Sequence, residues 1–127
     1  EDEVGYITLH IHSAMGEKVD EGMLAAVIVN ESIQQIEQEC GLSIDVNSLS
    51  YSRLLTHMKY LMARLRENET LTLDMEEYTK NAFPYSYQVA AHIIERLSRT
   101  LNREVPQIET GYLAMHIERV CQNERQA

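Results

Sequence analysis

The sequence predicts an all-α protein, a compact antiparallel bundle of about five helices, with an extra helix at its N-terminal end. Apolar residues recur at helical spacing along the chain, and no run alternates between apolar and polar residues around a hairpin turn. The 5 glycines and 2 prolines fall mostly at the ends of these segments. A chain of 127 residues fits one domain that can bury a sizeable core.

The N-terminal part of the chain is expected to form two helices. Residues 3–14 predict the first, and residues 15–19 a linker. Asp20 suits the N-cap of a second helix that ends at Cys40, because Gly41 can adopt the left-handed conformation that often follows a helix. The apolar stripe of this second helix consists of Leu24, Val27, Ile28 and Ile36.

The middle of the chain predicts a long helix and a short one. Asp45, Asn47 and Ser48 are capping residues for a helix that runs to about residue 67. The apolar positions of this helix keep helical spacing: Leu54, Leu55, Met58, Leu61, Met62 and Leu65. Residues 68–70 interrupt the pattern, and a short helix is expected at about residues 74–81.

Two prolines mark the last two predicted helices. Pro84 suits a first helical turn because the N–H that proline lacks has no intrahelical partner there. That helix is expected to end near Leu101, with Asn102 after it, and Pro106 is expected to open a last helix that ends near residue 123. The tail, residues 125–127, is expected to fray.

The charge of the chain argues against direct binding of nucleic acid. The net charge is −9, from 20 acidic and 11 basic residues, and no basic cluster occurs that would contact phosphates. No stretch is apolar enough to span a membrane, and no signal peptide is recognisable. The 2 cysteines, Cys40 and Cys121, are expected to be reduced thiols of a cytoplasmic protein.

One nine-residue pattern, E-x-G-Y-[IL]-[TA]-[LM]-H-I, occurs twice, at residues 3–11 and at residues 109–117. A repeat over this distance indicates two copies of a domain-sized unit. The first copy would contribute only its last helix, and the second would run complete from about residue 20. The histidines kept in both copies, His10 and His116, are therefore candidates for chemistry.

His57 is a second candidate, because Arg53 and Arg64 fall on the same shoulder of its predicted helix. Cations beside a histidine keep the imidazole neutral and nucleophilic, and guanidinium groups can hold an incoming phosphoryl group. The alternative is a histidine at the boundary of the core with two ordinary surface arginines.

His116 lies on an apolar arc of the last predicted helix, with Tyr112 one turn and Glu109 two turns before it. A core histidine is the alternative, although His10 has the same neighbours. A metal site built from His57, His116 and Glu109 is a further alternative, but no metal-binding motif supports it. His12 is expected at the surface, and His92 is expected to be structural.

Three motifs in this order resemble one known module. They are T-H-M-K-Y-L-x-x-R-L at residues 56–65, F-P-Y-S-Y at residues 83–87 and E-x-G-Y-x-x-x-H-I at residues 109–117. Together they are similar to the phosphotransferase-system regulation domain, or PRD, of bacterial antiterminators of the BglG type, including the glucose-operon group. The resemblance assigns residues 20–124 to a complete second PRD and residues 1–14 to the last helix of a truncated first one.

The resemblance implies a function that the residue patterns alone do not give. It implies a five-helix, homodimeric regulatory domain that is not an enzyme and needs no cofactor or metal. His57 and His116 would be phosphorylated, as would His10 in the truncated PRD, by the phosphocarrier protein HPr and by sugar-specific enzyme II as a second candidate. Phosphorylation would control dimerisation and hence RNA-binding antitermination, with RNA bound only by a missing N-terminal domain and no membrane contact.

The supporting residues follow from the same assignment. Arg53 and Arg64 would support the phosphoryl group, and Glu109 and Tyr112 would lie behind the histidines. Three alternatives stay open at this point: a PRD from a DNA-binding activator, a metal-dependent helical hydrolase, and a purely structural dimerisation bundle.

Overall fold

The computed structural model describes the backbone of residues 14–126, which forms five helices and no strand. The helices are α2 (Ala14–Cys40), α3 (Leu49–Glu67), α4 (Glu76–Ala82), α5 (Pro84–Leu101) and α6 (Ile108–Gln126). This confirms the predicted all-α fold. The predicted helix at residues 3–14, with His10 and His12, lies outside the described residues except for its last position.

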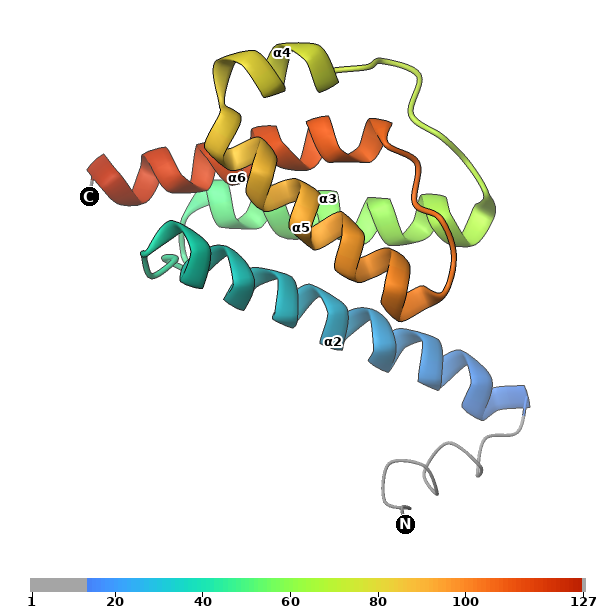
Figure 1. Cartoon of the computed structure of the whole chain (residues 1–127). Coiled ribbons are helices and arrows are strands. Elements are labelled where there is room, and N and C mark those ends of the chain that lie inside the picture. Colours follow the sequence, from blue (N-terminus) through green and yellow to red (C-terminus); the bar gives the residue numbers. More distant parts are fainter. Residues whose placement is uncertain (1–13, 127) are drawn as a thin grey trace.

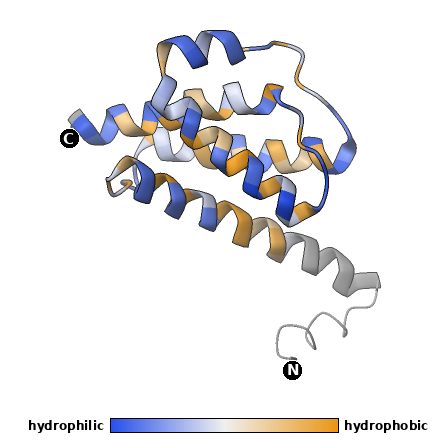
Figure 2. Ribbon diagram, in the orientation of Figure 1, coloured by the Kyte–Doolittle hydropathy of each residue, from blue (hydrophilic) through white to orange (hydrophobic). Residues whose placement is uncertain are grey.

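Helix α6 is the centre of the molecule, and α3, α4 and α5 all pack against it (Figure 1). Its inward side is fully buried at Leu113, Ala114 and Ile117. Figure 2 shows hydrophobic and hydrophilic residues alternating around α5 as the helical period requires. Much of the remaining core comes from the predicted apolar stripe of α3 and from α5: Leu54, Met58, Leu61, Leu65, Val89, Ile93 and Leu97.

The predicted helix ends are confirmed at four positions. Gly41 follows α2 with a φ of 66°, a left-handed conformation in which glycine has no Cβ to clash. The Ser48 side chain caps α3 by accepting a hydrogen bond from the backbone N–H of Tyr51 at 3.1 Å. Asn68 and Asn102 end α3 and α5 with φ values of 59° and 53°.

The start of α2 differs from the prediction. The helix begins at Ala14, so residues 15–19 are helical and Asp20 is not its N-cap. Residues 15–19 contain one glycine and no proline, and the other four residues are compatible with a helix. This segment therefore does not interrupt α2. A linker between two domains, if it lies here, is therefore helical.

Only half of the apolar stripe predicted for α2 is buried. Ile28 and Ile36 are buried, but Leu24 and Val27 are 43% and 50% exposed. Figure 1 shows the N-terminal end of α2 extending beyond the end of α5, so this part of the helix has less of the bundle to cover it. The periodicity identified the helix without showing how far its partners reach.

The last helix also has different bounds from those predicted. Pro106 lies in a turn, where its carbonyl accepts a hydrogen bond from the Glu109 N–H, and the helix begins at Ile108. At the other end, Arg125 is helical, so the tail does not fray at that residue. Its guanidinium lies 3.4 Å from the Glu118 carboxylate two turns earlier on the same helix. Ala127 lies outside the described residues.

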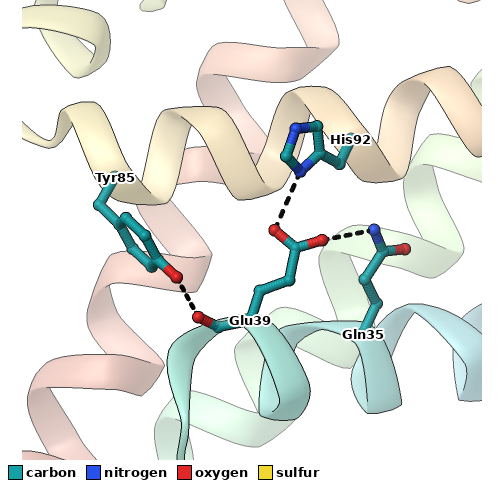
Figure 3. A network of polar contacts seen from close by, with 4 residues as sticks. All are labelled: Gln35, Glu39, Tyr85 and His92. Carbon is teal, nitrogen blue, oxygen red and sulfur yellow. Dashed lines mark hydrogen bonds and ion pairs between the residues drawn. The ribbon is translucent and has the colours of Figure 1, made fainter.

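A polar network centred on Glu39 ties α2 to α5 (Figure 3). One carboxylate oxygen lies 2.9 Å from Nδ1 of His92, and the other accepts a hydrogen bond from Gln35. The Tyr85 hydroxyl donates to the Glu39 carbonyl. His92 has a structural role as predicted, but through a charged partner that the local sequence did not reveal.

The two cysteines meet where α2 ends beside α6. The thiols of Cys40 and Cys121 are free and lie close to each other. Nearby, the Glu124 carboxylate accepts a hydrogen bond from the Asp45 N–H at 2.6 Å. The loop after α2 is thereby fixed to the C-terminal part of α6.

Candidate functional site

The motif at residues 109–117 directs each of its characteristic side chains to a different neighbour. Glu109 is completely buried and accepts two hydrogen bonds from Arg64 on α3, from Nε at 2.8 Å and from the terminal nitrogen at 2.7 Å. Gly111 faces α4, where a Cβ at this position would lie 2.8 Å from the backbone nitrogen of Glu76. These two contacts fix the rotation of α6 against α3 and α4.

The same helix rotation brings His116 to His57. The centres of the two imidazole rings are 4.6 Å apart, and the ring planes are tilted by 31°. Tyr112, one turn before His116, lies nearly parallel to His57 with ring centres 6.3 Å apart. The structure therefore brings together the two predicted histidines and the predicted tyrosine, from two helices that are distant in sequence.

The histidine pair opens into a pocket of about 400 Å³. His57, His116 and Arg53 line it, and the remaining lining residues are Leu49, Ser52, Thr56 and Tyr60. Sequence reasoning missed these four. Their spacing on α3 was the available signal. Ser52, Thr56 and Tyr60 follow one another at intervals of four residues, and Leu49 lies four residues before Arg53, which is four before His57.

The two predicted arginines have different surroundings. Arg53 lines the pocket, whereas the guanidinium of Arg64 is engaged by the buried Glu109 carboxylate. Arg53 and Arg64 lie on the same side of α3, but they are not equivalent, because α6 places the Glu109 carboxylate against Arg64 only. Arg64 positions the helices, and Arg53 is the arginine that lines the pocket.

A metal site at these residues has no support from their arrangement. The Glu109 carboxylate points to Arg64, and among the side chains that the structure describes, residues 22–125, no group of three histidines, cysteines, aspartates or glutamates is placed to hold a metal ion. The arrangement instead combines two imidazoles, a guanidinium and an open pocket, which suits an incoming anionic group.

Comparison with known families matches residues 30–120 to the model of the PRD domain. The chain belongs to the PRD family. The match contains α3, α4, α5, most of α6 and the C-terminal part of α2, so the fold described above is that of a PRD and the residues of the site lie within the match. The predicted resemblance is confirmed.

Relatives of this PRD include two proteins named for antitermination. The chain is 34% identical over 125 residues to the "GlcA/glcB genes antiterminator" of Staphylococcus carnosus, covering 96% of this chain and 44% of that protein. It is 30% identical over 124 residues to the "PtsGHI operon antiterminator" of Bacillus subtilis, covering 94% of this chain and 44% of that protein. The PRD thus spans less than half the length of these relatives.

The imidazoles of the PRD site are held neutral. Burial is the main cause that lowers the pKa of His57, to about 3, with smaller contributions from His116 and Arg64. Burial also lowers the pKa of His116, helped by Arg119 and Arg53. Nε2 of His57 and Nδ1 of His116 are buried without a hydrogen-bond partner among the described residues, which makes protonation still less favourable.

The lowered pKa of His57 predicts that acid destabilises this PRD. An unfolded histidine titrates near 6.5, so below that pH the unfolded chain binds a proton that the folded chain does not. The free energy of unfolding is expected to fall by about 1.4 kcal/mol per pH unit from this residue, between about pH 6 and pH 4.

Urea unfolding at several pH values checks this prediction. A His57→Gln variant should lose that part of the pH dependence, while the carboxylates contribute equally to both proteins. Identical slopes for the two proteins would contradict a neutral, buried His57.

No helix in the described part of the chain is long and apolar enough to cross a membrane.

Proposed function

We propose that this PRD is the regulatory domain of a bacterial transcriptional antiterminator, and that phosphorylation of His57 and His116 controls its dimerisation. The names of its relatives support antitermination over DNA-binding activation. The acidic chain would leave RNA binding to a domain outside it. Acting in the cytoplasm, the PRD would be a substrate of phosphoryl transfer and would catalyse no reaction of its own.

One observation carries the phosphorylation proposal. Two neutral imidazoles lie side by side and line an open pocket that Arg53 also lines. A neutral imidazole is a nucleophile, and a guanidinium binds the phosphoryl oxygens through charge-assisted hydrogen bonds. Such a pocket suits a phosphoryl group delivered by HPr or by sugar-specific enzyme II. His10 is a further proposed acceptor, outside the described residues.

The surface around the pocket supports a homodimer as the controlled state. Val46, Leu49 and Tyr60 are each more than 60% exposed, and Leu49 and Tyr60 line the pocket itself. Large apolar side chains gathered at one opening favour contact with another protein surface. A phosphoryl group adds about −1.5 to −2 charges there, so it would change the free energy of association of two copies.

Phosphoryl transfer from HPr tests this function directly. We expect the chain, incubated with HPr, enzyme I and phosphoenolpyruvate, to carry phosphohistidine at His57 or His116, mapped by mass spectrometry at alkaline pH. The sedimentation coefficient should change when the label is added and return when it is hydrolysed. His57→Ala and His116→Ala should each remove one labelled peptide.

Two results would overturn the proposal. One is a chain that remains unlabelled at both histidines while a known HPr substrate in the same tube is labelled. The other is a labelled chain whose association state is the same as that of the unlabelled chain across a range of concentrations.

A further inference from the structure

The two histidines of the site share one pocket rather than having one each. Their ring centres lie 4.6 Å apart, and both rings line the same opening. One ring nitrogen of each is completely buried, Nε2 of His57 and Nδ1 of His116. A donor protein must therefore approach both rings through the same space, and phosphoryl groups on the two rings would lie within a few ångströms of each other.

The pocket offers little positive charge for a second phosphoryl group. Arg53 is the only lysine or arginine among the described residues that line it. Arg64 is engaged by the Glu109 carboxylate, and Arg119 lines a different pocket although its charge reaches His116. One phosphoryl group can be matched by Arg53, whereas two would place about three to four negative charges against it.

Given the proposed phosphorylation, we propose that the pair is single-occupancy: His57 and His116 accept phosphoryl groups as alternatives, and phosphorylation of one blocks the other. In each transfer a lone pair on the imidazole attacks phosphorus, the N–P bond to the donor's phosphohistidine breaks, and the donor leaves as a neutral imidazole. The accepting ring keeps its proton on the other nitrogen. No oxidant, metal or further reactant is needed.

The energetics of transfer favour this exclusion. The bond broken in the donor and the bond formed in the acceptor are both N–P bonds of a phosphohistidine. The free-energy change of a first transfer is therefore small. Repulsion between two doubly charged groups at this separation lowers the equilibrium constant of the second transfer by about one to two orders of magnitude, even in bulk water. The doubly phosphorylated site should stay a minor species.

A count of phosphoryl groups on single molecules tests the exclusion. The chain is prepared with His10, His12 and His92 replaced by glutamine, which leaves only the pair, and is phosphorylated to saturation by HPr with enzyme I and phosphoenolpyruvate. Intact mass at alkaline pH should show one phosphoryl group per chain, with less than about a tenth carrying two. Peptide mapping should find both histidines labelled in the population.

A charge substitution gives an independent measurement on the otherwise unchanged chain. His57→Asp places one negative charge beside His116. The control is His57→Asn, whose side chain has nearly the same shape as aspartate but no charge. The rate of labelling at His116 should be lower in His57→Asp than in His57→Asn by about tenfold. Circular dichroism of all the variants establishes that they are folded.

The outcomes separate this inference from the proposed function. A majority of chains with two phosphoryl groups, or equal rates in the aspartate and asparagine variants, would overturn single occupancy while leaving phosphorylation intact. A chain with no label on His57 and none on His116 would instead overturn the proposed function.

Discussion

Replacing Arg64 by alanine is expected to lower the free energy of unfolding by about 3–5 kcal/mol. Glu109 has no exposed side-chain surface, and both of its carboxylate oxygens accept hydrogen bonds from Arg64. Without the guanidinium, a buried carboxylate would keep its desolvation penalty and lose its partner. Urea unfolding at neutral pH measures the loss.

The neighbouring Arg66 provides a matched control on the same helix. Its ion pair with Glu67 is exposed at both side chains, so Arg66→Ala should change stability by less than about 0.5 kcal/mol. The double variant Arg64→Leu with Glu109→Leu should be more stable than Arg64→Ala, because it leaves no unpaired charge in the interior. Equal losses for the two alanine variants would contradict the ion pair's structural role.

Gly111→Ala is expected to destabilise the protein by about 1–3 kcal/mol, although alanine is the better helix former. The new Cβ would lie 2.8 Å from the backbone nitrogen of Glu76 and 2.8 Å from the carbonyl carbon of Met75. Backbone atoms at the start of α4 cannot rotate away as a side chain can. Either α4 moves off α6 or the two helices are strained, and urea unfolding measures the loss in either case.

Gly22→Ala tests the same substitution without the neighbour. A Cβ at Gly22 meets no atom within 4 Å, so alanine in α2 should raise the free energy of unfolding by about 0.5–1 kcal/mol. Opposite signs for the two variants would show that close helix approach, and not helix propensity, determines the glycine at position 111. Stabilisation by both would contradict the packing described for α4 and α6.

Much of the fold could be predicted because its signals are local. Gly41, Ser48, Asn68 and Asn102 end or begin helices through their own backbone and side-chain properties, and each is where the sequence placed it. The start of α2 was wrong for a related reason. Asp20 has the chemistry of a cap, but a capping residue does not by itself interrupt a helix whose preceding residues also favour one.

The site was less predictable because its decisive contacts join helices that are far apart in sequence. Helical spacing brought Arg53, His57 and Arg64 to one shoulder of α3, but only α6 distinguishes the two arginines by placing Glu109 against one of them. Spacing also put Glu109 on the stripe of His116, where it looked like a neighbour of the imidazole. Helix periodicity reports which residues share a face and gives no information about what that face meets.

The burial of His57 has a consequence for what the proposed switch can sense. An imidazole with a pKa of about 3 does not change its protonation over the pH range in which a cell lives. Its readiness to accept a phosphoryl group is therefore the same in a mildly acid cell as in a neutral one. A site of this kind would respond to the supply of phosphoryl donors and not to a moderate change of pH.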